Sequence, residues 1–261
     1  MSVPLAFLGI VIVWSTTPLA IKWSGENVGF LFGISGRVAI ATLICLLVFI
    51  VMRWPLPRDR RALHVYLAIG LPFYIAFMSV YWGAQYISSG MVSVLFGLTP
   101  IFTGILASVW LKEMSFNVPR VAGMSLGVIG LLVIFNKAFI FGENALLAMF
   151  SILFAAFIHS LSTVWVKRTN KTLTPIAVNT GGLIVALVLF SLTWLISGQS
   201  FPAEIPDHTA FAILYLAIFG SVFGAVMFYY ALKHVEATTM GMLPLITPVT
   251  ALLLGNGLIM K

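Results

Sequence analysis

The chain has 261 residues, of which 61% are hydrophobic and only 8% are charged, and its formal net charge is +7. Soluble domains carry about 25% charged residues, so a chain this poor in charge excludes an ordinary soluble fold. In a bilayer the backbone must bond within the protein, which leaves helical bundles or closed barrels. The apolar runs are about 20 residues long and lack two-residue alternation, so we predict an all-α, polytopic membrane helical bundle.

Nine apolar segments are predicted to span the membrane. The first begins at Val3 without a preceding basic region and is predicted to be a true membrane helix, not a cleavable signal. Cys45, the single cysteine, lies in the second segment, which excludes a disulfide framework. In chain order the segments cover residues 3–22, 30–52, 63–86, 89–111, 118–136, 145–166, 174–197, 210–232 and 238–259.

The basic residues lie mostly in short connections and predict the orientation of the chain. With the N-terminus in the cytoplasm, ten lysines and arginines fall on the inner side and three on the outer side. Positive residues accumulate on the cytoplasmic side of membrane proteins, so we predict a cytoplasmic N-terminus. The positive charge is thereby explained without a nucleic-acid partner. The inner set is Arg53, Arg58, Arg60, Arg61, Lys112, Arg120, Lys167, Arg168, Lys171 and Lys233.

An internal repeat relates the two parts of the chain. Leu98-Thr99-Pro100 aligns with Ile246-Thr247-Pro248 at an offset of 148 residues, and Trp14-Ser15 aligns with His159-Ser160 at an offset of 145. Helices 1–4 therefore recur as helices 6–9, five helices later and in the opposite direction, as in many secondary transporters. We predict two inverted five-helix repeats, residues 1–140 and 141–261. The counterpart of helix 5 is missing, so we expect this chain to stop one helix short of ten.

Several of these motifs resemble the EamA-type drug/metabolite transporters. The resemblance covers Trp14-Ser15-Thr16, Arg37, the Thr-Pro pairs of helices 4 and 9, Leu111-Lys112-Glu113 and the run 230–234. It implies a ten-helix inner-membrane transporter that exports amino acids, related metabolites or small drugs. The alternative within the same superfamily is a carrier of sugar phosphates or nucleotide sugars, which would need several basic residues inside the membrane.

Aromatic and polar residues in the repeated helices are predicted to line a central substrate cavity. Such a cavity would be mostly apolar with a few orienting polar groups, as is usual for small-molecule sites. In helix 3 the spacing of the predicted residues places them on one face. The candidates are Trp14, Ser15, Tyr74, Met78, Tyr81, Trp82, His159, Ser162, Phe228, Tyr229 and Tyr230.

Prolines and one charge complete the candidate site. Pro100, Pro244 and Pro248 remove backbone hydrogen bonds and are predicted to break helices 4 and 9, as gates or binding regions. Arg37 is the one basic residue inside a span, where it holds a substrate carboxylate, snorkels, or pairs with helix-end carbonyls. His159 either exchanges protons or is a neutral hydrogen-bonded side chain.

All seven acidic residues lie in or beside loops, so the spans contain no carboxylate of the kind used by proton relays and cationic-drug sites. An Asp-rich metal motif is also absent, which argues against an integral membrane enzyme and predicts no cofactor and no metal. We therefore expect a secondary transporter that binds a small molecule in the lipid bilayer and exports it by alternating access. The sequence leaves the oligomeric state open and allows a monomer.

Overall fold

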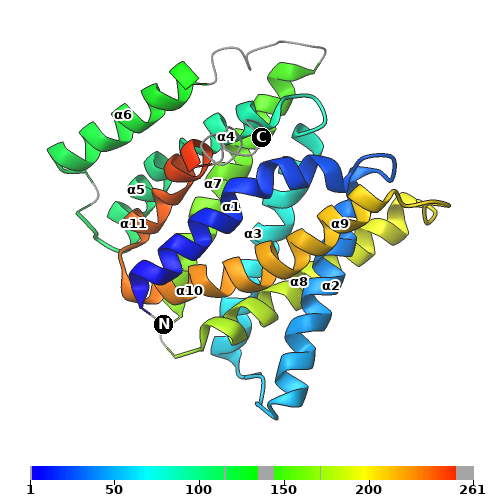
Figure 1. The fold of residues 1–261 in the computed structure, drawn as a ribbon. Helices are drawn as coiled ribbons and strands as arrows, with labels where there is room; N and C mark the ends of the chain where they lie inside the picture. The colour runs from blue at the N-terminus through cyan, green and yellow to red at the C-terminus, as the bar shows by residue number, and fades with distance from the viewer. Residues whose placement is uncertain (1, 115, 135–143, 171, 251–261) are drawn as a thin grey trace.

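The structure is a computed structural model, and it describes residues 2–114, 116–134, 144–170 and 172–250. Within these residues it is all-helical, and seven helical spans are long and apolar enough to cross a membrane. A shorter apolar helix, α6, lies along one edge of the bundle (Figure 1). Large apolar side chains such as Leu195 and Ile196 cover much of the outside, as a lipid environment requires.

The helices follow the predicted apolar segments closely. In chain order they are α1 (Val3–Ser24), α2 (Phe30–Val51), α3 (Arg60–Gly83), α4 (Ser89–Phe96), α5 (Thr99–Trp110), α6 (Val118–Ile134), α7 (Ala145–Thr169), α8 (Pro175–Ser197), α9 (Asp207–Tyr215), the π-helix η2 (Leu216–Gly224), α10 (Ala225–His234) and α11 (Ala237–Gly241). Residues 243–250 are also helical, and the rest of the predicted ninth span lies outside the described residues.

Three spans depart from a single regular α-helix. The fourth is broken between α4 and α5, and Pro100 is the second residue of α5. The ninth is broken at Met242, and Pro244 is the second residue of the helix that follows. Pro244 thus follows the break in its span as Pro100 follows the break in the fourth, although the repeat aligns Pro100 with Pro248. Helix continues through Pro248, where we had predicted a break. The eighth span contains η2, a feature that often marks functional sites.

Helix ends are set by ordinary capping chemistry. Thr174 accepts a hydrogen bond from the Ala177 backbone N–H (3.4 Å) at the start of α8, and Pro175 occupies the first turn. Ser88 does the same for α4 through the N–H of Met91 (3.2 Å). Gly198 ends α8 with a φ of 62°, a left-handed conformation that glycine adopts without strain.

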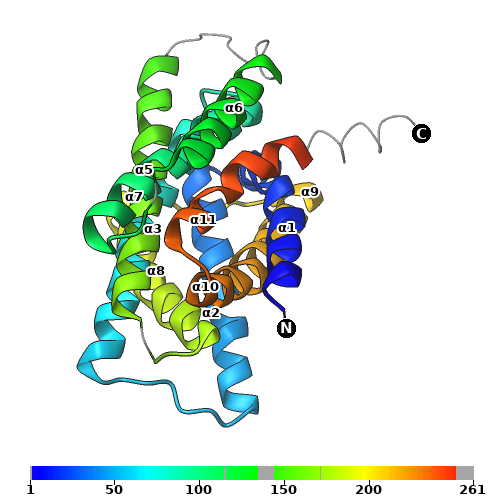
Figure 2. The same ribbon diagram turned by 90° about the vertical axis from the view of Figure 1, so that its left-hand side faces the viewer.

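Packing relations confirm the two inverted repeats. α3 packs against α7 and α8, and its equivalent, the α9–η2–α10 span, packs against α1 and α2. The hydroxyl of Ser160 on α7 binds that of Thr103 on α5 (3.0 Å). The repeat-related Ser15 on α1 binds the hydroxyl of Thr250. The same contacts are thus made twice, each time between the two repeats, and Figure 2 shows α1 of the first repeat beside α9 and α10 of the second.

The tightest helix contact joins α3 to α8 and depends on glycine. A Cβ on Gly181 would lie only 2.0 Å from a ring carbon of Tyr66, and a Cβ on Gly70 would lie 2.6 Å from the Gly182 carbonyl oxygen. Lipid tails are as apolar as the side chains, so membrane helices associate largely through van der Waals packing. Small residues improve that packing because they let the helix backbones approach closely. This contact fixes the position of α3, which forms one wall of the cavity described next.

Candidate functional site

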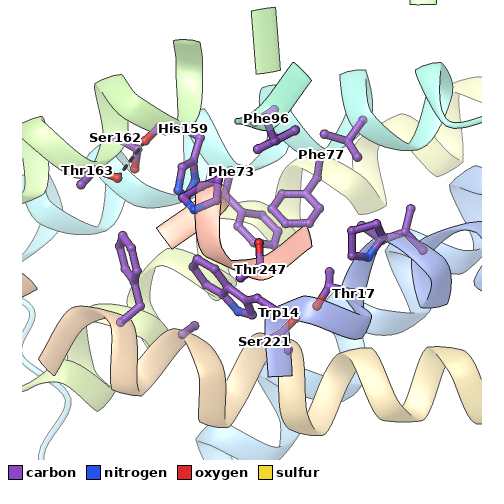
Figure 3. A pocket seen from close by; sticks show the side chains of 18 of the residues that line it. Trp14, Thr17, Phe73, Phe77, Phe96, His159, Ser162, Thr163, Ser221 and Thr247 are labelled. Carbon is purple, nitrogen blue, oxygen red and sulfur yellow. Dashed lines mark hydrogen bonds between the residues drawn. The ribbon is translucent and has the colours of Figure 1, made fainter. Parts of the chain in front are cut away.

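A cavity of about 170 Å³ lies between the two halves. α1, α2, α3 and α4 line it from the first half, and α7, η2, α10 and residues 244–248 line it from the second. Figure 3 shows the rings of Trp14, Phe73, Phe77 and His159 converging on this space from three different helices. The volume is below the 300–1,000 Å³ typical of drug-sized ligands, so the cavity suits a small molecule.

Aromatic rings form the centre of the cavity. Trp14 on α1 stacks on Phe228 on α10 with ring centroids 5.2 Å apart. His159 on α7 meets the edge of Trp14 at 6.3 Å and lies 5.9 Å from Phe228. Trp14 and His159 are repeat equivalents, so the two halves meet here through matching positions. Phe73 and Phe77 stack on each other at 4.2 Å and extend the aromatic wall along α3.

Arg37 is the charged residue that lines this cavity, and its side chain does not extend to the membrane surface. The residue is only 3% exposed and lies two turns inside α2. Its Nε donates a hydrogen bond to the Ser221 hydroxyl on η2 (2.7 Å), and its guanidinium lies 4.8 Å from the centre of the Phe77 ring. The structure therefore corrects both expectations of snorkelling and of pairing with helix-end carbonyls. η2 supplies the contact because Gly220 and Ser221 face α2.

The hydroxyls of the lining mostly donate to nearby backbone carbonyls. Ser162 donates to the Ala68 carbonyl on α3 (2.8 Å), and Thr163 donates to the His159 carbonyl (3.0 Å). Thr17 donates to the Val13 carbonyl (3.2 Å). A hydroxyl carries one proton, so these groups offer the cavity oxygen lone pairs and no further donor.

The structure brings about half of the predicted site residues together. Arg37, Trp14, His159, Ser162, Phe228, Tyr229, Pro244 and Pro248 line the cavity. The remaining candidates lie outside the lining: Ser15, Tyr74, Met78, Tyr81, Trp82, Tyr230 and Pro100.

The misplaced residues of α3 have a common geometric cause. Tyr74, Met78 and Tyr81 each follow a lining residue by one position, and one residue turns an α-helix by about 100°. Tyr74 instead bonds the Thr193 hydroxyl on α8 (2.7 Å), and Tyr81 is buried in the core. Trp82 packs on the ring of Tyr86, with ring centroids 5.0 Å apart.

Two further candidates are occupied by local contacts. Ser15 follows the lining residue Trp14 by one position, and its hydroxyl bonds the Val11 carbonyl and the Thr250 hydroxyl. Tyr230 follows the lining residue Tyr229 by one position, and its ring packs on that of His234 with ring centroids 4.5 Å apart. Each of these two residues thus lies on the same helix as a lining residue, one position away from it.

Sequence reasoning did not predict the α3 face that lines the cavity or the partner of Arg37. The signal for α3 was Pro72, which lies inside a span and shares the face of Phe73, Phe77 and Val80. Ser221 could have been suspected from its place among Gly220 and Gly224 in an apolar span. Other lining residues that were not predicted are Thr17, Phe96, Thr163 and Thr247.

The cavity lies nearer one end of the bundle than the other. One end of the bundle carries Arg53, Arg60, Lys112, Arg168 and Lys233, and we call it the basic end. We call the other end the opposite end. On the side of the opposite end, the outermost lining residues of α1, α3 and α4 lie three residues from the helix ends. On the side of the basic end, the last lining residues are Thr163 on α7 and Tyr229 on α10. Each lies at least five residues before the end of its helix.

A polar network lies at the basic end of the bundle. Lys167 at the end of α7 donates from Nζ to the carbonyls of Leu232 and Val235 (both 2.7 Å) at the end of α10. Glu113 accepts from the backbone N–H groups of Ala237 (2.9 Å) and Thr238 (3.1 Å). Charged hydrogen bonds of this kind are the stronger ones in proteins. We call these contacts the basic-end lock.

A salt bridge beside this network joins the two repeats. Arg120 of α6 contacts Glu236, just before α11, with a nitrogen-to-oxygen distance of 2.5 Å. The pair is partly exposed, so it contributes little to stability by itself.

Comparison with known proteins agrees with this architecture. The chain is 25% identical over 255 residues to "Uncharacterized transporter YoaV" of Bacillus subtilis (strain 168), covering 97% of this chain and 87% of that one. It is 25% identical over 264 residues to "Uncharacterized inner membrane transporter YedA" of Escherichia coli (strain K12), covering 97% and 81%. A solved structure, titled "Crystal structure of protein", shares the fold with a TM-score of 0.75 at 18% identity, covering 97% of this chain and 86% of that one.

The EamA-like transporter family matches residues 1–136 and 146–260, which is nearly the whole chain. Two inverted halves around a central cavity are the arrangement expected of such a protein. The chain is a multi-pass integral membrane protein and belongs to the EamA-like transporter family.

Proposed function

We propose that this transporter moves small amphipathic metabolites, amino-acid-like compounds among them, through the central cavity by alternating access. The observation that carries the proposal is a cavity lined by both inverted repeats, which lies nearer one end of the bundle, with the hydrogen bonds of the basic-end lock beyond it toward the other end. Substrate sites at the interface of inverted repeats are the common arrangement in secondary transporters.

The charge distribution supports an orientation. Lysines and arginines gather at the basic end, so the positive-inside rule places that end and the N-terminus in the cytoplasm. The cavity then faces outward in this conformation, which is the state from which an exporter releases its substrate. A bacterial inner membrane fits this reading, and one relative is named an inner membrane transporter.

The repeat supplies the expected form of the inward-facing state. Lys22 is the repeat equivalent of Lys167, and Ala84 and Ile87 are the equivalents of Leu232 and Val235. In the described part of the chain, the exposed Lys22 side chain makes no hydrogen bond. In the alternate state we expect Lys22 to bind the carbonyls near Ala84 and Ile87 and so close the opposite end.

The lining disfavours the sugar-phosphate or nucleotide-sugar carrier. Phosphate groups carry up to two charges and call for several basic donors. Among the described residues, Arg37 is the one lysine or arginine in the lining. We further propose facilitated transport down a substrate gradient, because no carboxylate of the described chain lines the cavity to take part in a proton relay.

Transport by purified protein in liposomes tests the proposal. The panel contains radiolabelled amino acids, aromatic acids, aromatic amines and neutral aromatic compounds, and protein-free liposomes are the control. We expect saturable movement of at least one compound without an imposed proton gradient. Absence of movement for the entire panel contradicts the proposed function.

A further inference from the structure

Arg37 occupies a position where a charge is costly. It is 3% exposed inside a membrane-spanning helix, where inserting a charged side chain costs free energy unless the charge is paired or hydrated. Intramembrane arginines are therefore found paired with other groups or beside water.

The partners that Arg37 has in the structure do not include an anion. Its hydrogen-bond partner in the described part of the chain is the neutral Ser221 hydroxyl, and its Nη1 is buried without a hydrogen-bond partner. The Phe77 ring stabilises the guanidinium from one side. The described carboxylates lie outside the cavity lining. A guanidinium has five N–H groups, so most of its donor capacity is unused here.

The surroundings of Arg37 are built to hold the guanidinium beside the cavity. Nη2 lies 3.2 Å from where a Cβ on Gly220 would be, so the absence of a side chain there makes room for the group. The Ser221 backbone carbonyl accepts a hydrogen bond from the Asn179 side chain (2.9 Å), which ties η2 to α8. Arg37, Phe77, Gly220 and Ser221 all line the cavity.

The rest of the cavity is suited to an uncharged, apolar group. Trp14, Phe96, His159 and Phe228 surround its centre. Flat aromatic or branched apolar bodies bury well against such rings. A molecule that fills this space with an apolar body and reaches Arg37 with an anion would satisfy both regions.

We propose that Arg37 binds the carboxylate of the substrate, and that the substrates are small organic carboxylates with an apolar or aromatic body, amino acids included. This assignment rests on the proposed transport function. A planar carboxylate accepts two parallel N–H bonds from a guanidinium, which a lysine ammonium does not provide. Compounds of the same shape without a carboxylate leave the charge unpaired and bind more weakly.

Three compounds that share a phenyl ring and a three-carbon chain separate the contributions. L-Phenylalanine carries a carboxylate and an ammonium, 3-phenylpropionate carries only the carboxylate, and L-phenylalaninamide carries only the ammonium. The measurement is the melting temperature of the purified full chain in detergent over a concentration series, since ligand binding to the folded state raises it. We expect both carboxylates to bind at least about tenfold more tightly than the amide, the loss expected for hydrogen bonds to a charged group.

Variants assign the effect to Arg37. Arg37→Gln should abolish the difference between acid and amide, and Arg37→Lys should restore part of it. Arg168→Gln removes one positive charge from an exposed position outside the cavity and should behave as the unaltered chain. If Arg37→Gln does not fold, Arg37→Lys and the compound series on the unaltered chain still decide the question.

The outcomes distinguish this assignment from the transport function. Equal binding of the two acids and the amide, or binding of the amide alone, overturns the carboxylate assignment. Movement of amides or amines in the liposome assay would then keep the transport function while the assignment fails. Absence of both binding and movement for every compound overturns the two together.

Discussion

Replacing Lys167 tests the basic-end lock, because this one side chain joins α7 to the end of α10. Lys167→Met keeps the aliphatic stem and removes the ammonium group. The change leaves the carbonyls of Leu232 and Val235 without this donor. It should therefore raise the population of conformations in which the basic end is open.

The size of the effect follows from the two lost hydrogen bonds. A hydrogen bond to a charged group contributes about 1.5–3 kcal/mol when it is buried, and Lys167 is only partly buried. Water can replace part of each bond, so we take about 1.5–3 kcal/mol for the pair together. Since about 1.4 kcal/mol changes an equilibrium constant tenfold, opening of the basic end should rise about tenfold to a hundredfold.

Cysteine labelling measures this opening. Cys45 is the single cysteine and is buried, so Cys45→Ser gives a background for Thr163→Cys in the cavity wall. A membrane-impermeant maleimide is added from one side of the membrane at a time. In the background protein the introduced thiol should react from the opposite end only, and Lys167→Met should increase its reaction from the basic end about tenfold or more.

Arg168→Met is the matched control, because it removes a positive charge at the next residue without touching α10. It should leave labelling from the basic end unchanged. If Lys167→Met also leaves that labelling unchanged, Lys167 does not hold the basic end closed.

Three further predictions concern other parts of the molecule. Gly181→Ala should lower the free energy of unfolding by about 1–3 kcal/mol, seen as a lower melting temperature, because its Cβ would overlap Tyr66; Gly123→Ala, where no atom lies within 4 Å, should not. Lys22→Met should reduce labelling from the basic end, since it removes the expected lock of the inward-facing state; an increase would contradict the mirrored arrangement. His159→Gln should leave the pH dependence of transport unchanged, because no carboxylate of the described chain lines the cavity; loss of that dependence would assign proton exchange to His159.

Sequence reasoning predicted the spans and the inverted repeat well, because both depend on features that the chain carries locally. The length of each apolar run determines whether it can cross the bilayer, and the offset of five helices determines the relative direction of the halves. The break before Pro100 was predicted because proline removes a backbone hydrogen bond. The equivalent break lies before Pro244, and no local rule decides between Pro244 and Pro248 four residues apart.

The faces of the helices were harder to predict, because every face of a membrane helix can be apolar. In α3 the predicted face was rotated by one residue from the true one, which exchanged Phe73 and Phe77 for Tyr74 and Met78. Tyr74 was predicted to line the cavity because it carries a hydroxyl, but that hydroxyl bonds Thr193 on α8. The π-helix that places Ser221 against Arg37 depends on packing between distant spans, so local propensity does not reveal it.

The most direct test of transport through the central cavity is to fill it. Ala225 on α10 lines the cavity, and Ala225→Phe places a ring in that space. Ala→Phe at the lipid-facing side of the bundle, made at an exposed position such as Ala122 of α6, is the control for the added ring. In liposomes loaded with an unlabelled substrate from the panel, we expect uptake of the labelled compound by the unaltered chain and by the control. Ala225→Phe should fold with the same elution volume and take up none, whereas undiminished uptake by this variant would contradict transport through the cavity.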